Sequence, residues 1–432
     1  MFRFSFGRRT LLGLGDQEAI AAALRDRSEG FFRHTRQLET IGDEMGLAPG
    51  VFGANGKAWK NQRRMVTTGF HPAHIKAYFP SLLTVKQRLR AHWQPAVAGR
   101  TPLALQPGLM RFTVDVIAGL AFGADINTLE SDDDVIQRHL DEIFPALIKR
   151  IFSFLPMWRY VRLPADRQLE RSMGAVNEAI EGFIAQARAG LTADPARRTR
   201  PPNLLEAMIV AAGAGGSSVT DGEVASNVMT MLLVGEDTTA NTLIWLSYLL
   251  HRHPTALQCA RAEVHALGAD SATFTSEQMA GLDYLEACAH ETMRLKPVAP
   301  FQVIEARRDT VVAGMRVPAG TGVWCVMRGH SVDARHFPIP EAFEPRRWLS
   351  EGEANEDHSA SSAKRVSMPF GGGPRVCPGR YPALLEIMMA MAMLLTHFDT
   401  ADVTTPDGGE AREHMAFTMA PVGLRMTLRP RD

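Results

Sequence analysis

The chain has 432 residues, 45% of them hydrophobic, which is enough apolar material for a large core. Its 47 basic and 47 acidic side chains balance, so charge favours neither nucleic acid nor an anionic membrane, and the predicted partner is a small molecule. The cysteines are spaced too widely for a zinc or redox motif. The opening stretch MFRFSFGRRTLLGLGDQ predicts neither a membrane span nor a signal peptide, so a cytoplasmic location is expected.

Helical periodicity dominates the chain and predicts a mainly α fold in a single domain, residues 1–432. The predicted helices span residues 17–27, 72–92, 108–123, 136–154, 167–189, 203–212, 222–251, 254–267, 276–295 and 381–398. Short strands are predicted at 310–317, 321–326 and 423–429, which makes a small β region. Residues 193–202, 211–218 and 351–363 have the composition of exposed connections.

The predicted helix at 222–251 carries two carboxylates in the middle of an apolar run. Glu236 and Asp237 are the only charges between Val224 and Leu250, and a capping-box spacing at Thr220-Asp-Gly-Glu223 predicts where the helix starts. Burying an acid is unfavourable by several kcal/mol unless it is hydrogen-bonded or has a chemical role. A transmembrane helix with a functional acid and a core helix with satisfied polar groups are the alternatives.

A glycine-rich loop, FGGGPRVCPGR at 370–380, holds one cysteine just before the helix predicted at 381–398. Backbone N–H groups near a helix N-terminus stabilise an anion, so Cys377 is a candidate thiolate. A single thiolate without a neighbouring cysteine or histidine suits a metal whose other positions are already filled, as in haem. The alternative is a buried cysteine that acts as a small hydrophobic residue.

The loop resembles the haem-ligand loop of the cytochrome P-450 family of haem-thiolate monooxygenases at all five defining positions, Phe370, Gly373, Arg375, Cys377 and Gly379. The resemblance implies the helical fold of that family, with haem b between the oxygen-activating helix and the helix after the cysteine loop. It also implies that Cys377 is the iron ligand.

Three further segments resemble the family. Gly56–Arg64 is similar to the helix whose Trp and Arg hold a haem propionate, which maps to Trp59 and Arg63, and both side chains are donors, as a propionate requires. The pattern Glu291-Thr-Met-Arg294, with PEAFEPRRW at 340–348, resembles the family's buried ionic network, and Arg347 is its third member. A solvated i,i+3 pair is the alternative for Glu291 and Arg294.

The third segment is Val234-Gly-Glu-Asp-Thr-Thr239, which resembles the oxygen-activating motif. The resemblance implies that Gly235 lets the haem and dioxygen approach the helix backbone. It also implies that Asp237 and Thr238 relay protons for scission of the O–O bond. Glu236 stands at the variable position of the motif and is expected to face a structural partner.

The start of the chain departs from the family pattern. The segment beginning at Thr10 resembles the strand and helix that ordinarily follow about fifty residues with the first helix and first strand. That section is expected to be missing, which leaves the outer strand of the β region in doubt and suggests a truncated start.

The resemblance implies insertion of one oxygen atom of dioxygen into a lipophilic small-molecule substrate, with electrons from a separate ferredoxin or flavodoxin-type donor. Phe154, Phe301 and Phe417 suggest an apolar cavity. A monomer without a membrane span and without nucleic acid is expected. A haem-thiolate peroxygenase or isomerase and a non-catalytic haem-binding protein are the alternatives.

Overall fold

The chain folds into two compact units. The structure is a computed structural model, and it describes residues 2–6, 9–25, 30–32, 36–46, 49–131, 135–153, 156–214, 218–268, 273–349, 359–415 and 418–431. Unit 1 takes residues 1–32, 86–110 and 238–432 of the chain, and unit 2 takes residues 33–85 and 111–237. Three long helices, α4 (Pro72–Gly99), α5 (Leu105–Ile117) and α9 (Asp221–Arg252), contribute residues to both units.

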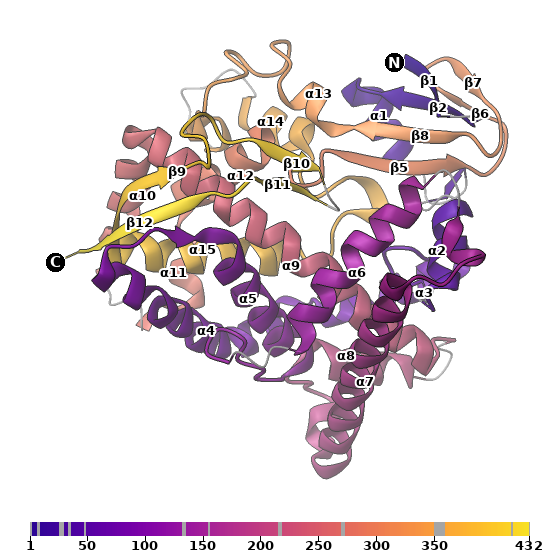
Figure 1. Ribbon diagram of the computed structural model, residues 1–432, viewed down its shortest axis with the longest axis horizontal. Helices are drawn as coiled ribbons and strands as arrows, with labels where there is room; N and C mark the ends of the chain where they lie inside the picture. Colours follow the sequence, from indigo (N-terminus) through magenta and orange to yellow (C-terminus); the bar gives the residue numbers. More distant parts are fainter. Residues whose placement is uncertain are drawn as a thin grey trace. The chain divides into compact units, whose positions relative to one another are not determined.

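Unit 1 contains a five-stranded sheet in the order β1-β2-β8-β5-β3 (Figure 1). Its strands are β1 (Phe2–Phe6), β2 (Arg9–Leu14), β8 (Gly322–Val326), β5 (Phe301–Ala306) and β3 (Phe31–Phe32). Strand β2 runs parallel to β8, and the other neighbours are antiparallel. The outer strand of the β region, which the sequence left in doubt, is present, because residues 2–6 pair with residues 9–13 and form the edge of the sheet.

The other strands of unit 1 are short. They form the hairpin of β6 (Thr310–Val312) with β7 (Met315–Val317), the hairpin of β10 (Glu413–Met415) with β11 (Met419–Pro421), and a sheet of β4 (Leu103–Ala104), β12 (Arg425–Pro430) and β9 (Phe398–Thr404). The strand predicted at 310–317 is therefore two strands. Ala313 and Gly314 turn the chain between them, with φ of 46° and 79°.

The helices of unit 1 are α1 (Gln17–Arg25), α10 (Pro254–Ala266), α11 (Ser276–Ala280), α12 (Asp283–Leu295), α13 (Met327–Ser331), α14 (Ser359–Ser367) and α15 (Arg380–His397), besides its part of α9. The helix predicted at 276–295 is two helices, because α11 ends at Ala280, with Gly281 as its C-cap, and the chain re-enters a helix only at Asp283. The predicted helix at 381–398 is confirmed as α15.

Unit 2 is helical in its described part. It consists of α2 (Arg36–Glu44), α3 (Gly56–Gly69), α6 (Val135–Phe152), α7 (Pro164–Ala193) and α8 (Leu204–Ala212), with its parts of α4, α5 and α9. A π-helical turn at Ala118–Phe122 continues α5. The core of the unit packs α3, α5, α7, α8 and α9 together through Val66, Val114, Val176, Leu205 and Val228. Sequence analysis located α3 only through the family resemblance and missed α2.

Helix α9 starts with the predicted capping box. The backbone N–H of Thr220 donates to Glu223 Oε2 at 2.8 Å, and the N–H of Glu223 donates back to Thr220 Oγ1 at 3.2 Å. The helix is continuous from Asp221 to Arg252. In the part of the chain that the structure describes, each helix is too short or too polar to cross a bilayer, which removes the transmembrane alternative for α9.

Candidate functional site

The cysteine loop lies in unit 1 and is held by its own backbone. The N–H of Cys377 donates to the carbonyl of Phe370 at 2.9 Å, and the N–H of Val376 donates to the carbonyl of Gly373 at 3.1 Å. These bonds present the Cys377 side chain at an exposed position, three residues before α15 begins at Arg380. The positive end of the α15 dipole stabilises a thiolate there. Cys377 is therefore exposed near the N-terminus of α15, which does not match the alternative of a buried hydrophobic residue.

Gly373 is required by the local geometry of this loop. Its φ is +65°, and a Cβ atom added there would collide with the carbonyl oxygen of Leu24, at the end of α1. Arg375 ends the short 3-10 turn that begins at Gly373, and Gly379 occupies the N-cap position of α15. At Gly379 an added Cβ would lie 3.8 Å from Cys377 Sγ, an ordinary contact, so sterics alone do not demand glycine.

The acid-containing segment of α9 has a distinctive burial pattern. Between residues 231 and 250 every side chain is buried except at four positions, Val234, Gly235, Asp237 and Thr238, which are half-buried. These four belong to the predicted oxygen-activating motif. Glu236 points elsewhere and is 2% exposed, while its backbone carbonyl accepts a hydrogen bond from Thr113 Oγ1 at 3.2 Å. Asp237 and Thr238, which are predicted to relay protons, are therefore among the few partly exposed positions of this segment.

Gly235 makes a close helix contact that sequence analysis did not predict. A Cβ atom at this position would lie 2.7 Å from Cδ1 of Ile117, at the end of α5 in the same unit. Glycine therefore lets α5 and α9 approach within unit 2, in addition to the role that the resemblance implies for it.

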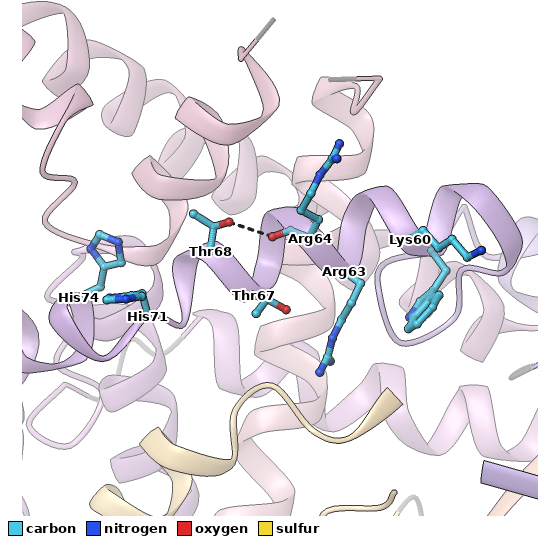
Figure 2. Close-up of a pocket in the computed structure, with 8 residues that line it drawn as sticks. Lys60, Arg63, Arg64, Thr67, Thr68, His71 and His74 are labelled. Carbon is cyan, nitrogen blue, oxygen red and sulfur yellow. Dashed lines mark hydrogen bonds between the residues drawn. The ribbon is translucent and has the colours of Figure 1, made fainter. Parts of the chain in front are cut away.

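Trp59 and Arg63 lie one turn apart on α3 and line a groove of about 630 Å³ in unit 2 (Figure 2). The other lining residues are mostly polar or basic: Lys60, Arg64, Thr67, Thr68, His71 and His74. Figure 2 shows Arg63 and Arg64 pointing to different sides of the helix. Trp59 is 5% exposed, Arg63 is half-buried and Lys60 and Arg64 are exposed. The groove offers N–H donors and positive charge to an anionic group.

A buried amide network fixes the rotation of α3. Gln62, 1% exposed, donates to the carbonyl of Pro49 at 3.2 Å and to Glu223 Oε1 at 3.1 Å, and its own oxygen accepts a bond from Asn227 at 3.0 Å. Because Gln62 is tied to α9 in this way, Trp59 and Arg63 are held in the groove. Nothing in the sequence pattern indicated this network.

The structure brings Glu291, Arg294 and Arg347 together in unit 1. Arg294 Nε and Nη2 each donate to one oxygen of Glu291 at 2.7 Å, and both side chains are fully buried. The remaining donors of Arg294 bond the carbonyls of Ser331, Pro340 and Ala342. Arg347 Nε lies 3.4 Å from Glu291 Oε1, a weaker contact. The solvated-pair alternative is thereby excluded.

The comparisons with known proteins agree with this geometry. A family model described as Cytochrome P450 matches residues 1–427. The chain belongs to the cytochrome P450 family. It is 25% identical to "Cytochrome P450 97B2, chloroplastic" of Glycine max over 95% of this chain and 77% of that protein. It is 28% identical to "Bifunctional cytochrome P450/NADPH--P450 reductase ALT2" of Alternaria alternata over 87% of this chain and 33% of that protein.

Solved structures give the same result for the fold. The haem domain of cytochrome P450DA, in a mutant form, superposes with a TM-score of 0.83 and 25% identity, covering 100% of this chain and 90% of that one. The predicted fold class, a mainly α cytochrome P450 fold with a small β region, is confirmed. Membership of the family makes the protein a haem-thiolate monooxygenase of the oxidoreductase class.

Two residues of the cytochrome P450 network were missed by sequence analysis. The indole of Trp348 donates to Glu291 Oε2, and the ring of His290 stacks on Trp348 with centroids 5.0 Å apart and contacts Phe370 edge-on at 6.5 Å. His290 thus lies between the ionic network and the cysteine loop. Both residues could have been found from their positions in the sequence, because Trp348 directly follows Arg347 and His290 directly precedes Glu291.

Cys288 is a poor candidate for the iron ligand. All four cysteines are thiols, and burial raises the pKa of Cys288, which disfavours its thiolate. Among the residues with described positions, no cluster of three His, Cys, Asp or Glu side chains could hold a metal ion. Phe301 stacks on Trp324 with centroids 4.8 Å apart, whereas Phe154 and Phe417 lie outside the described residues.

Proposed function

We propose that this monooxygenase binds haem b through Cys377 and inserts one atom of dioxygen into a lipophilic small molecule. The observation that carries the proposal is the exposed Cys377 thiol, held by its backbone bond to Phe370 just before the N-terminus of α15. An exposed cysteine at the positive end of a helix is the environment in which a thiolate ligand forms.

The residues present fit haem b. The Cys377 thiolate would hold its iron, and its two propionates would need hydrogen-bond donors. In unit 2, Trp59 and Arg63 of the groove offer such donors, and in unit 1 Arg375 of the cysteine loop offers another. When bound, the haem supplies the reduction of dioxygen, the splitting of its O–O bond and the transfer of one oxygen atom to the substrate.

Asp237 and Thr238 would supply protons. The overall reaction consumes two electrons and two protons, and the second oxygen atom leaves as water. The hydroxyl of the half-buried Thr238 is suited to hold a proton at the site, and the carboxyl of the adjacent Asp237 would replace that proton from solvent. Val234, half-buried on the same segment, presents apolar surface, which supports a lipophilic substrate.

The electrons would come from a separate ferredoxin or flavodoxin-type protein. Lys60 and Arg64 on α3, and Arg380 at the start of α15, are exposed. Basic side chains of this kind attract an acidic protein surface and accelerate its association. We also propose that the protein is a monomer. A reducing, cytoplasmic compartment is proposed as well, which is supported by its four cysteines, all among the described residues, forming no disulfide.

The experiment that tests the proposal is the carbon monoxide spectrum of the reduced, haem-loaded protein. Cys377→Ser should abolish the thiolate-type spectrum, because a neutral alcohol replaces the anionic ligand. Cys259→Ser, which changes a half-buried thiol on α10, is the matched control and should leave the spectrum unchanged. A spectrum that is identical in the wild type and in Cys377→Ser would disprove the ligand assignment.

A further inference from the structure

Within unit 1, four residues share one face of α9 through their spacing of three, four and three: Thr238, Asn241, Trp245 and Tyr248. Beyond Thr238, this face binds the chain around the β10–β11 hairpin. Asn241 Nδ2 donates to Thr418 Oγ1 at 3.0 Å, and Tyr248 Oη accepts the N–H of Ala411 at 3.3 Å. The helix face that carries Thr238 therefore also contacts the chain at Ala411 and at Thr418, on either side of strand β10.

The hairpin itself is too small to fix its own position. Its ladder has three residue pairs, from Glu413 opposite Pro421 to Met415 opposite Met419. An isolated two-stranded hairpin of this length is not stable in water. Its placement therefore depends on contacts with the rest of the unit, of which the backbone bond from Met419 to the carbonyl of Val298, 2.8 Å long, is one.

Glu413 makes the strongest of these contacts. Its carboxylate accepts a bond of 2.7 Å from Lys296 Nζ and two bonds from the guanidinium of Arg328. The carboxylate side chain is only 17% exposed. Burial by itself would raise the pKa of Glu413, but the hydrogen bonds from Arg328 and Lys296 lower it overall, so the group is a paired carboxylate at neutral pH.

Lys296 extends the contact to α9. Its ammonium lies 4.8 Å from the centroid of the Trp245 ring, within the range of a cation–π interaction. Trp245 is fully buried and lies seven residues after Thr238 on the same face. Glu413, Lys296 and Trp245 thus form a chain of contacts from the hairpin to the helix that carries the proposed proton donor.

We infer that Glu413 is a positioning residue: through Lys296 and Arg328 it fixes the β10–β11 hairpin against the face of α9 that carries Thr238, and so pre-forms one wall of the substrate site. This inference rests on the proposed function, because it takes Thr238 as a marker of the site. A wall fixed in advance loses less conformational entropy when a ligand packs on it. Neutralising Glu413 should therefore weaken the binding of ligands that reach the wall and leave the binding of other ligands unchanged.

The test compares two azoles on the haem-loaded protein. Imidazole and 4-phenylimidazole both bind a haem iron through nitrogen and shift the Soret band, but only the second has a ring that extends into the substrate site. Glu413→Gln should lower the affinity for 4-phenylimidazole by about three- to tenfold and leave the affinity for imidazole within about twofold of the wild-type value. Hydrogen exchange of residues 411–422 should become faster in this variant, whether or not an azole is bound.

The matched control is Asp309→Asn. Asp309 holds another hairpin, β6–β7, through Arg316 and the N–H of Ala319, so the substitution loosens a hairpin that does not carry Glu413. Both azole affinities and exchange at 411–422 should stay at wild-type values. If Glu413→Gln does not fold, Arg328→Gln serves in its place, since it leaves the bond from Lys296, and a smaller effect in the same direction is expected.

The outcomes separate the two proposals. Unchanged exchange at 411–422, or faster exchange with unchanged 4-phenylimidazole affinity, overturns the inference about Glu413 and leaves the proposed function standing. Equal weakening of both azoles also overturns it, because the change then acts at the haem and not at the wall. No Soret shift with imidazole in any variant, the wild type included, would overturn the proposed function together with the inference.

Discussion

The indole Nε1 of Trp348 donates a hydrogen bond of 2.9 Å to Glu291 Oε2, inside the buried ionic network of unit 1. Glu291 is fully buried, and its other bonds come from Arg294 and from the backbone N–H of Glu344 at 2.9 Å. Each oxygen therefore accepts two donors. A carboxylate that has lost contact with water depends on such donors to remain charged.

Trp348→Phe should destabilise the protein by about 1–3 kcal/mol, because a buried charged acceptor loses one donor while the aromatic volume is largely kept. The measurement is the free energy of unfolding in urea, together with the haem content of the purified protein. Because His290 stacks on Trp348 and contacts Phe370, haem content should also fall.

The matched comparison lies within the same network. Arg294→Met should be worse, by about 3–5 kcal/mol, since it strands the Glu291 charge. Arg347→Met should be the mildest of the three, because its Nε contact with Glu291 is 3.4 Å long. If Arg347→Met proved the most damaging, the ranking of these contacts would be wrong.

The ion pair in this network could be predicted from the sequence, whereas the backbone groups that complete the network could not. Glu291 and Arg294 are three residues apart on one helix, so their pairing follows from helix geometry. The carbonyls that use the other donors of Arg294 belong to Ser331, Pro340 and Ala342, and their placement depends on how irregular chain packs beyond α12. No local pattern encodes that placement.

The same distinction holds for the fold. Helices α9 and α15 were predicted closely because long apolar periodicity specifies them. Strands β3 and β4 have two residues each, which is too short for an alternating pattern to be recognised. At the site, the loop around Cys377 was predicted from its residues and the family resemblance, whereas the contact of Gly235 with Ile117 depends on how two helices pack.

That contact predicts a compensating pair of substitutions. Gly235→Ala should destabilise unit 2 by up to about 1 kcal/mol, since the new methyl group would lie 2.7 Å from Ile117 Cδ1 and the Ile117 side chain must shift to make room for it. Ile117→Val removes that methyl group, so the double variant should regain part of the loss. A double-mutant cycle of unfolding free energies measures the coupling. Additive effects would show that the two side chains do not compete for the same space.

Thr238→Ala should uncouple electron consumption from product formation. The variant lacks the hydroxyl proposed to hold a proton, so hydrogen peroxide should accumulate in place of product while ligand binding persists. The measurement is peroxide formed per electron pair consumed, and Thr239→Ala, which changes a neighbouring buried threonine, is the matched control. Full coupling in Thr238→Ala would rule out the proton-donating role.

Glu386 predicts an unusual dependence of stability on pH. The side chain lies on α15, is 4% exposed, and its Oε1 has no hydrogen-bond partner among the residues that the structure describes. Burial raises the pKa of this carboxyl well above its ordinary value of 4.5. In the folded protein Glu386 therefore keeps its proton at a pH where the unfolded chain has lost it.

The sign of the effect follows from proton linkage. Below about pH 4.5 both states are protonated, and above it the unfolded state binds fewer protons, so stability falls as the pH rises towards the raised pKa. Glu386→Gln cannot ionise, so its stability relative to the wild type should increase between about pH 5 and pH 8. Glu413→Gln should show the opposite trend, because the lowered pKa of Glu413 stabilises the wild type above pH 4.5 and this contribution is lost as the pH falls. Urea unfolding is the measurement, from about pH 5 to pH 8 for Glu386→Gln and from about pH 3 to pH 5 for Glu413→Gln, where the lowered pKa of Glu413 has its effect. Parallel pH profiles for Glu386→Gln and the wild type would show that Glu386 is not a buried neutral acid.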